Sequence, residues 1–392
     1  MVLRKYFIFF VNCLFVSLVF DPGDLLLGLK MPLFAICAIM LILDLWLYRQ
    51  LAIPKNLLSI NGIVLTIPIV SFMIYLIRNG SIPFNGLDLY KGYVIITLSI
   101  LLVHFKYSPI VILSSILTVL SCFIILIYFL VLVFPELYNG IYYWGMNYQV
   151  FLIGERSYDA EVDSMWSIYF VTSPLLVIPI AYYSDLYHKL KSKYVLVLLI
   201  INIIAMFLAG TRNNMFVSIL LPISLFYYYS RKKLLYIVFG FSLLFLVVYL
   251  NSDLLRAMFS LSEPSNETKF GLIDDYLKIF SEPSTLFLGQ GLGSSIFWES
   301  RGKADFVTEL TYLEVFRNFG FIMGSLLILV VFAPIGFIFV KKYRNSLFYL
   351  LISYLFYLVM SATNPIFFMS MGMIFFPIVL YELYAKGRNI FV

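Results

Sequence analysis

Long apolar segments separated by shorter polar connections fill most of this 392-residue chain. A bilayer core requires about 20 apolar residues per helix, and by this measure the pattern predicts about twelve transmembrane helices. We therefore expect an all-α polytopic membrane protein, folded as a single integral membrane domain over residues 1–392. The predicted helices lie near residues 5–20, 31–48, 57–77, 92–105, 109–134, 166–184, 194–210, 213–230, 234–250, 312–340, 346–362 and 366–384.

Two long polar stretches, at 135–165 and 251–308, interrupt the apolar pattern. Lysine and arginine gather in alternate short connections, such as the one that holds Lys189 and Lys191, whereas nearly every carboxylate falls in the others. Basic residues mark cytoplasmic loops. The pattern therefore predicts that both termini are cytoplasmic, that the helix count is even, and that both long loops lie on the outer side.

The N-terminal segment has Arg4 and Lys5 before an apolar run that ends at Phe20. This order is typical of a signal peptide, but no small-residue cleavage site follows. The polar residues 21–24 follow instead. We expect an uncleaved first transmembrane helix.

Composition supports the membrane assignment. The chain is 62% hydrophobic and 12% charged, with a mean hydropathy of +0.97, whereas a soluble protein carries roughly 25% charged residues. The net charge of +6 comes from residues that cap apolar segments and not from a basic patch, which argues against nucleic-acid binding. The cysteines and histidines have no metal-ligand spacing, so we expect no metal site and no cofactor; they are Cys13, Cys37, Cys122, His104 and His188.

The second long loop is expected to be ordered and partly helical. Residues 274–280 have an amphipathic pattern, and the Ser-Glu-Pro-Ser sequence at 281–284 should end that helix. Long loops in compact proteins are usually functional or disordered. Apolar residues such as Leu272 and Tyr276 favour order here.

Asparagines inside apolar segments are candidates for hydrogen bonds between helices. Amide side chains often hydrogen-bond across transmembrane helix pairs. The candidates are Asn61, Asn202, Asn251 and Asn364.

The sequence Gly-Thr-Arg-Asn-Asn at 210–214 separates two apolar segments and is too short for a long loop. Arg212 is therefore predicted at a tight outer turn. A guanidinium offers a planar fork of donors that suits a pyrophosphate. The alternative is an arginine that extends to lipid headgroups.

A glycine cluster, Gly289, Gly291 and Gly293, follows a short apolar stretch. A dinucleotide-binding fingerprint would require a strand and a helix around it, and these are not predicted. The cluster is either a flexible turn or a set of backbone amides close to a bound anion or sugar.

Glu309, Tyr312, Glu314 and Arg317 lie on one predicted helix that enters the membrane. At the helical angle per residue, Glu309 and Arg317 differ by about 80° and share a broad face. Glu314 and Arg317 are spaced to form an internal salt bridge. The alternative is a carboxylate acting as general base beside an arginine that binds phosphate.

These features resemble the Wzy-type O-antigen and polysaccharide polymerases, which belong to a superfamily with the O-antigen ligases. The resemblance rests on the hydropathy pattern, on the turn at 210–214, and on the glycine cluster followed by Glu-Leu-Thr-Tyr-Leu-Glu-Val-Phe-Arg-Asn-Phe-Gly at 309–320. In motif it covers only about 210–214 and 286–325.

The resemblance implies a bacterial inner-membrane glycosyltransferase of the GT-C type, with both long loops and the active site facing the periplasm. Such an enzyme moves the growing glycan from undecaprenyl pyrophosphate onto a new lipid-linked repeat unit. It uses no metal and no nucleotide sugar. The implied partners are lipid-linked oligosaccharide and membrane lipid, with a chain-length regulator protein as a further candidate.

This chemistry requires a base for the acceptor hydroxyl and cations for the departing pyrophosphate. Glu309 is the first candidate base, because it precedes the membrane-entering helix and follows the glycine cluster, and Asp305 is the second. The candidate residues for binding substrate or pyrophosphate are Arg212, Arg301, Arg317, Arg256, Arg156 and Tyr312.

Two other functions stay open. Ligases of the superfamily place a histidine near the end of the large loop, where this chain has Asp305 and Glu309 instead. A flippase of lipid-linked oligosaccharide also has about twelve helices, but it keeps its charge inside the helix bundle and has short loops. The two long loops favour an enzyme. The sequence leaves open the sugar, the linkage, the retaining or inverting outcome and the oligomeric state.

Overall fold

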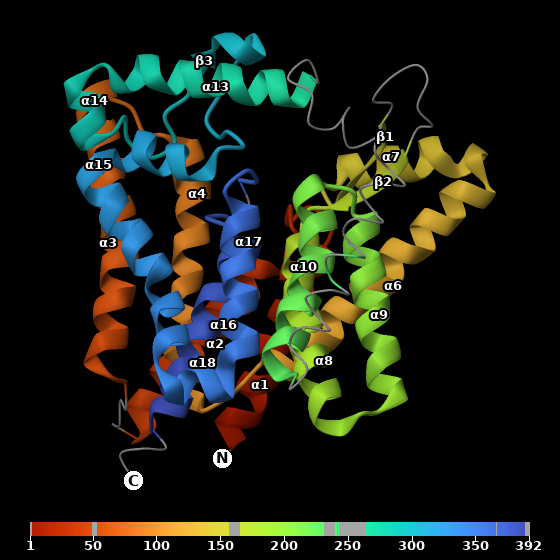
Figure 1. Ribbon diagram of the computed structural model, residues 1–392. Helices are drawn as coiled ribbons and strands as arrows, with labels where there is room; N and C mark the ends of the chain where they lie inside the picture. Colours follow the sequence, from red (N-terminus) through yellow and green to blue (C-terminus); the bar gives the residue numbers. More distant parts are fainter. Residues whose placement is uncertain are drawn as a thin grey trace. The chain divides into compact units, whose positions relative to one another are not determined.

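The computed structural model describes residues 2–48, 53–156, 165–230, 264–365 and 367–388, together with residues 240 and 242. The predicted helix at 234–250, Asn251 and Arg256 therefore lie outside the described residues. The described chain is mostly helical (Figure 1). Six of its helices are long and apolar enough to cross a bilayer, at Leu3–Phe20, Lys30–Tyr48, Lys55–Asn79, Phe84–Phe105, Ile110–Val133 and Thr311–Phe339.

The sequence predicts one domain, whereas the chain divides into two compact units. The first unit comprises Met1–Tyr48, Ser108–Ser260 and Leu347–Tyr357, and the second comprises Arg49–Tyr107, Leu261–Ser346 and Leu358–Val392. Helix α16 (Lys341–Ser361) contributes residues to both. Each unit is described by itself.

The first unit packs its helices around α6 (Ile110–Val133), whose inward face is buried at Leu113, Leu117 and Leu120. Asn202 donates to Thr118 over 3.0 Å and accepts from Ser121 over 2.8 Å, so the predicted link between helices is confirmed. The other helices of the unit are α1 (Val2–Phe20), α2 (Lys30–Tyr48), α7 (Tyr138–Asn147), α8 (Val177–Leu190), α9 (Lys193–Leu208) and α10 (Arg212–Tyr229), with 3-10 turns η2 (Pro135–Leu137) and η3 (Ser173–Leu176).

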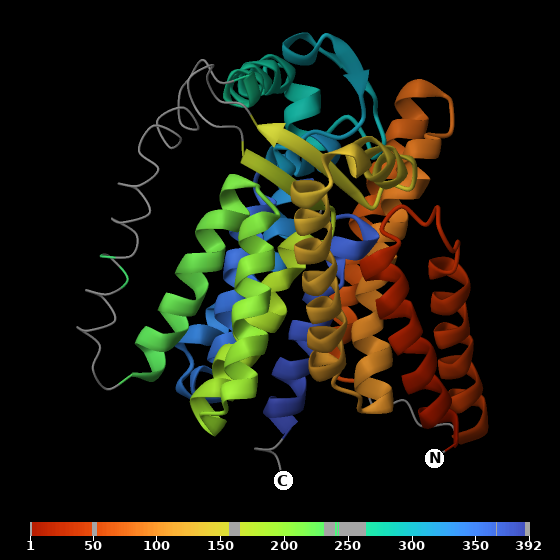
Figure 2. The same ribbon diagram turned by 90° about the vertical axis from the view of Figure 1, so that its right-hand side faces the viewer.

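The first unit also holds an antiparallel hairpin of β1 (Phe151–Arg156) and β2 (Met165–Phe170), in register from Phe151 with Phe170 to Arg156 with Met165. Figure 2 shows these strands (yellow) across the ends of α6 and α9. The prediction of a helix over 166–184 is therefore wrong in its first part. Residues 166–172 are mostly aromatic and β-branched, which favours a strand, and an apolar run alone does not distinguish the two structures.

The second unit is built on α3 (Lys55–Asn79), a helical run made of α4 (Phe84–Val94), η1 (Ile95–Thr97) and α5 (Leu98–Phe105), and α15 (Thr311–Phe332) with η5 (Ala333–Phe339). Asn61 of α3 donates to Ser99 of α5 over 2.9 Å, a second confirmed link between helices. The unit is completed by α17 (Ser370–Met373) and α18 (Phe375–Arg388). The predicted helix at 366–384 is thus divided in two.

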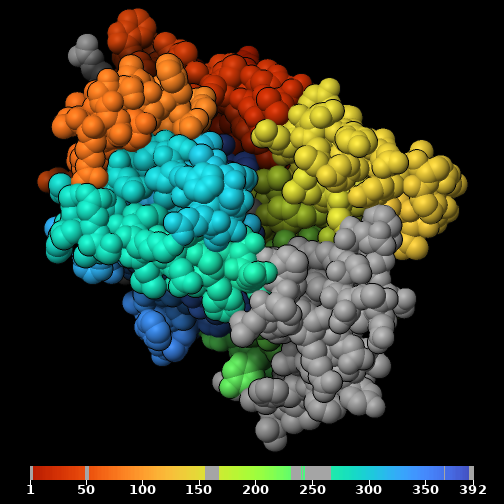
Figure 3. Space-filling view, turned by 90° about the horizontal axis from the view of Figure 1, so that it is seen from above, coloured from red at the N-terminus to blue at the C-terminus, as the bar shows by residue number. Residues whose placement is uncertain are grey.

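The described part of the second long loop is ordered and lies across one end of this unit (Figures 1 and 3). It consists of α13 (Pro264–Phe280), α14 (Pro283–Leu288), β3 (Ile296–Trp298), η4 (Glu299–Arg301) and β4 (Lys303–Asp305). The predicted helix end at Phe280 is confirmed. Leu272, Tyr276 and Trp298 form a buried core beneath α13, which explains the apolar residues of this loop. Two short two-stranded hairpins accompany the helices, and the mostly helical chain agrees with the predicted all-α class.

Candidate functional site

Helix α15 is broken at Gly320, where φ is 71° and ψ is 173°. A Cβ at this position would lie 2.2 Å from the carbonyl oxygen of Phe287, so only glycine fits. The break deprives carbonyls in the preceding turn of their usual amide donors four residues ahead. A buried carbonyl without a donor is costly, so these groups require partners from elsewhere in the unit.

The glycine-containing loop after α14 supplies those partners. The amide of Gln290 donates to the carbonyl of Arg317 over 2.7 Å, and the amide of Gly291 donates to the carbonyl of Asn318 over 3.2 Å. The Ser71 hydroxyl of α3 also donates to the Asn318 carbonyl, over 2.6 Å. The loop thus completes the broken helix.

Gly289, Gly291 and Gly293 all have positive φ, at 77°, 97° and 84°. A Cβ on Gly291 would lie 2.4 Å from the Cβ of Tyr75, and one on Gly293 would lie 2.3 Å from the amide nitrogen of Gly86. The loop is therefore a close crossing of backbones and not a flexible turn. The Gly289 and Gly291 amides donate to Thr285 and Asn318, so an anion nest built on these two groups is also wrong.

Arg317 is fully buried, and all three of its nitrogens donate to groups of the protein. Its Nε donates to Glu314 over 3.1 Å, and its Nη2 to Glu314 and to the carbonyl of Phe306. Its Nη1 donates to Gln290 over 3.1 Å and to Ser294 over 2.7 Å, and its guanidinium carbon lies 5.7 Å from the centre of a Trp298 ring. The prediction that Arg317 binds pyrophosphate is therefore wrong, and the alternative of an internal salt bridge with Glu314 is confirmed.

Glu314 joins this network with both carboxylate oxygens. One oxygen accepts from the Tyr276 hydroxyl over 2.6 Å and from Arg317 Nε, and the other accepts from Arg317 Nη2 and from Asn318 over 2.9 Å. Burial, followed by the charge of Glu314, raises the pKa of Tyr276 far above its usual range. The Tyr276 hydroxyl is therefore a neutral donor that ties α13 to α15.

The candidate bases lie in a separate group that we call the loop ion cluster, made of Lys269, Arg301, Lys303, Asp305 and Glu309. Arg301 lies 3.1 Å from a Glu309 oxygen and 3.8 Å from an Asp305 oxygen. Lys269 lies 3.9 Å from Glu309, and Lys303 lies 3.2 Å from Asp305. The structure thus brings together three predicted site residues and adds two lysines.

The two carboxylates differ in how firmly they are held. One carboxylate oxygen of Asp305 accepts a hydrogen bond from the amide of Phe306 over 2.8 Å. The backbone of Asp305 pairs with that of Ile296 in the β3–β4 hairpin. The side chain of Asp305 is 24% exposed, whereas that of Glu309 is 42% exposed. Glu309 is therefore the more accessible of the two to an incoming hydroxyl group.

Of three other predicted site residues, the structure describes the side chain of Tyr312 alone. The hydroxyl of Tyr312 donates to the carbonyl of Leu358 over 2.7 Å, so its role is to join α15 to α16 rather than to bind substrate. The side chain of Arg156, at the end of β1, lies outside the described residues, as does Arg256.

Arg212 is the first residue of α10 in the first unit. The preceding Thr211 caps the helix by accepting from the Asn214 amide over 3.1 Å. Gly210 has φ of 69°, and a Cβ there would lie 2.1 Å from the Cβ of Ser167 in β2. The predicted tight turn is confirmed, and it lies against the hairpin of the first long loop.

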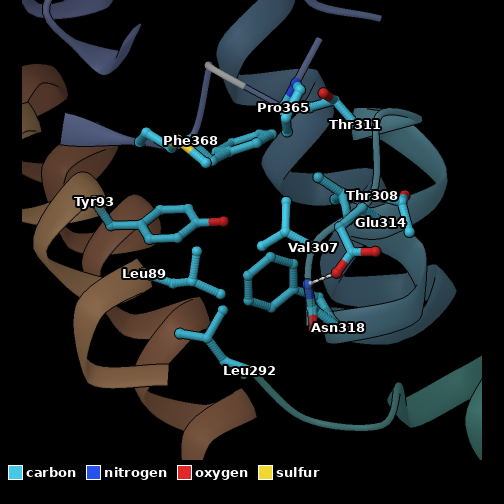
Figure 4. A pocket seen from close by; sticks show the side chains of 13 residues that line it. Leu89, Tyr93, Leu292, Val307, Thr308, Thr311, Glu314, Asn318, Pro365 and Phe368 are labelled. Carbon is cyan, nitrogen blue, oxygen red and sulfur yellow. Dashed lines mark hydrogen bonds between the residues drawn. The ribbon is translucent and has the colours of Figure 1, made fainter. Parts of the chain in front are cut away.

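A pocket of about 30 Å³ opens in the second unit between α4, the glycine-containing loop, the start of α15, and Pro365, Phe368 and Met369 (Figure 4). Glu314 and Asn318 form part of its wall, and the Tyr93 hydroxyl points into it. Sequence reasoning missed Tyr93, since one tyrosine in an apolar segment is not a distinctive signal. The residues that line the pocket are Leu89, Tyr93, Leu292, Val307, Thr308, Thr311, Glu314, Val315, Asn318, Phe319, Pro365, Phe368 and Met369.

The chain matches no model of a known protein family, no curated protein and no solved structure.

Proposed function

We propose that this protein is a membrane glycosyltransferase that polymerises a bacterial surface polysaccharide, such as an O-antigen, from lipid-linked repeat units. One observation carries the proposal: a partly exposed carboxylate, Glu309, lies between Arg301 and Lys269 just before a membrane-entering helix. A base and two cations at that position suit a reaction on a lipid-linked substrate at the membrane surface. The resemblance to polysaccharide polymerases supports the same function.

In the proposed reaction, a sugar hydroxyl of the acceptor unit attacks the anomeric carbon that is linked to undecaprenyl pyrophosphate. Glu309 takes the hydroxyl proton as the new glycosidic bond forms. The bond between the anomeric carbon and the pyrophosphate oxygen breaks, and the released lipid pyrophosphate carries away the electron pair. Arg301 and Lys269 stabilise the charge of this leaving group.

The charge balance of the loop ion cluster supports an anionic substrate. Its three cations outnumber its two carboxylates, so the cluster has a net positive charge. Arg301 is held at 13% exposure between its two carboxylate partners and is thus positioned before substrate arrives. Positioned cations require little reorganisation in the transition state. The active site would face the periplasm, in a protein of the inner membrane.

A second candidate function is a carrier of lipid-linked oligosaccharide, and the break in α15 favours it. Discontinuous helices form the central binding sites of many transporters. Here the carbonyls of Arg317 and Asn318, close to the break, accept hydrogen bonds from the protein. The break therefore has a structural explanation that requires no cargo, and the polymerase is the better supported function.

The test is the polysaccharide ladder of a strain that lacks this protein. Loss of a polymerase leaves single-repeat material, loss of a ligase leaves bare lipid core, and loss of a flippase leaves lipid-linked units on the inner leaflet. In complemented strains, Glu309→Gln should abolish chain extension at normal protein level, because glutamine keeps the size of the side chain but is not a base. Glu267→Gln, an exposed change on α13, serves as the matched control.

If Glu309→Gln leaves a wild-type ladder and Asp305→Asn abolishes it, the base is Asp305. Wild-type ladders from both variants would remove the carboxylate-base mechanism from this loop.

A further inference from the structure

The pocket beside the broken helix contains a tyrosine hydroxyl that the described protein does not use. Tyr93 is 3% exposed, and its hydroxyl points into the pocket (Figure 4). Within the described part of the chain this hydroxyl has no hydrogen-bond partner. The side-chain oxygen of Asn318, another residue of the lining, is buried and has no hydrogen-bond partner among the described residues. A buried polar group without a partner is costly, so this wall suggests a ligand.

The Tyr93 ring is held firmly in place. It stacks on Phe368 with 5.4 Å between ring centres and meets the edge of Phe319 at 5.9 Å. The Phe368 backbone approaches so closely that a Cβ on Gly92 would lie 2.0 Å from its carbonyl oxygen. The hydroxyl therefore has a defined position.

The hydrogen bonds of Glu314 decide which of the hydroxyl groups of Tyr276 and Thr308 is the donor in the contact between them. A carboxylate offers about four lone-pair sites, and all of them on Glu314 are occupied by Tyr276, Arg317 and Asn318. Tyr276 must donate its proton to Glu314. In its 2.5 Å contact with Thr308 it is therefore the acceptor, and Thr308 is the donor.

Thr311 donates its hydroxyl proton to the carbonyl of Asn364 over 2.7 Å. Thr308 and Thr311 both line the pocket, and both have committed their protons elsewhere. Their remaining lone pairs are acceptors. The pocket is thus suited to a ligand that donates hydrogen bonds.

The pocket is also electrically neutral. Among the described residues of its lining, Glu314 is the one carboxylate and no lysine, arginine or histidine is present; the charge of Glu314 is balanced by Arg317. A charged ligand would lose its hydration without gaining a partner of opposite charge, which is costly. The rest of the lining is largely apolar, with Leu89, Leu292 and Val307 beside the polar groups. A neutral ligand with both hydroxyl groups and a hydrocarbon face fits this lining.

We propose that this pocket binds one edge of a neutral sugar or polyol group, with hydroxyls that donate to Thr308 and Thr311 and exchange a hydrogen bond with Tyr93. The chemical class follows from the pocket. The identification of the group as a sugar of the lipid-linked repeat rests on the proposed function. Thr308 and Thr311 of the lining flank Glu309 in the chain, so under the proposed function the pocket is a candidate subsite for the sugar on which Glu309 acts.

Direct binding tests this proposal without enzyme turnover. The full-length protein in phosphatidylcholine nanodiscs is titrated with methyl β-D-glucopyranoside and with glycerol, and binding is followed by saturation-transfer-difference NMR. Tyr93→Phe should bind both probes about fivefold more weakly, as expected for one lost hydrogen bond. Leu89→Phe, which fills the pocket, should abolish binding. Tyr90→Phe removes a hydroxyl from the same helix outside the pocket lining and should bind like wild type.

Thermal unfolding separates a binding role from a structural role for Tyr93. Because its hydroxyl has no partner in the described protein, Tyr93→Phe should unfold at the same temperature as wild type or a higher one. A lower unfolding temperature together with unchanged probe binding would overturn the proposal. Absence of probe binding to the wild-type protein would overturn it as well.

A lipid headgroup could supply the same hydroxyl chemistry. Addition of phosphatidylglycerol to the nanodiscs should leave glucoside binding unchanged if the ligand is a sugar. Competition by this lipid would show that the pocket binds lipid and would overturn the sugar assignment. Glucoside binding to a protein that is inactive as a polymerase would keep the pocket proposal and reject the proposed function.

Discussion

The amide of Gln290 donates a 2.7 Å hydrogen bond to the carbonyl of Arg317, in the turn of α15 that precedes the break at Gly320. The side chains of the same two residues also meet, since Arg317 Nη1 donates to the Gln290 amide oxygen over 3.1 Å. The loop outside the membrane-spanning helix and the helix itself are therefore parts of one structure. Any substrate-binding surface on this loop depends on the integrity of the break.

Gly320→Ala should strongly destabilise the second unit. The new Cβ would clash with the Phe287 carbonyl at 2.2 Å, and a positive φ of 71° is unfavourable for alanine. Strain at one such residue costs roughly 1–3 kcal/mol, and the clash adds to it. Thermal unfolding in detergent should show a clear fall in midpoint. Gly62→Ala, in α3 with no atom beyond the local helix backbone within 4 Å of the new methyl group, should be neutral or stabilising. Equal midpoints for both variants would contradict the packed crossing.

Breaking the buried pair between Glu314 and Arg317 should be more damaging than replacing both members. Arg317→Met leaves a buried carboxylate without its cation, which costs about 3–5 kcal/mol. The double variant Glu314→Gln with Arg317→Met removes that charge and should recover part of the loss. The free energies of unfolding of the two single variants and the double variant measure the coupling.

The control for this set of variants is Lys91→Met, which breaks the ion pair between Lys91 and Asp88. The side chains of these two residues are 51% and 70% exposed. Exposed pairs contribute about 0–1 kcal/mol, so little change is expected. An Arg317→Met variant as stable as this control would show that the pair is not a structural centre.

The sequence predicted the helices better than their interruptions. The hydropathy pattern places the helix at 110–133 within one residue at each end, because a long apolar segment leaves few alternatives. It misassigned the strand at 165–170, since aromatic and β-branched residues are apolar in both structures. The break at Gly320 depends on donors from residues 71, 290 and 291, and local sequence does not contain that information.

The candidate site was predicted in part for a similar reason. The sequence named Glu309, Asp305 and Arg301 as separate candidates, and the structure shows that they lie together. Spacing allowed both interpretations of Arg317, and only its burial and its partners decided between them. The pocket around Tyr93 joins segments more than 200 residues apart in the chain, so no short motif could reveal it.

Arg301→Ala should reduce polymerisation more than Lys303→Ala. Arg301 contacts both candidate carboxylates and is 13% exposed, whereas Lys303 contacts Asp305 alone within the loop ion cluster and is 61% exposed. Under the proposed mechanism Arg301 also stabilises the leaving pyrophosphate, so its loss should shorten the ladder severely. The ladders of the two variants at matched protein level are the measurement. Equal ladders would remove Arg301 from the proposed site.

The topology follows from the placement of lysine and arginine and can be tested with reporter fusions. Fusions near residues 150, 190, 280 and 343 should report outside, inside, outside and inside in that order. Within the second unit, Lys342 donates to the carbonyl of Gly387 over 3.3 Å, which agrees with a common side for residue 343 and the C-terminal helix. A cytoplasmic signal at residue 280 would contradict the proposed reaction, because the loop ion cluster would then face the wrong compartment.

Arg212 remains a candidate for binding the carrier pyrophosphate, and a charge-conserving change tests it. Lysine keeps the charge but not the planar fork of donors, so Arg212→Lys should lose much of the polymerisation and Arg212→Ala nearly all of it. The control is Thr211→Ala, which removes the helix cap of α10 at a cost of about 1 kcal/mol without changing the charge at this turn. If this control shortens the ladder as much as Arg212→Ala does, the effect comes from the structure of the turn. A full-length ladder from Arg212→Ala would leave Arg212 as an anchor to lipid headgroups.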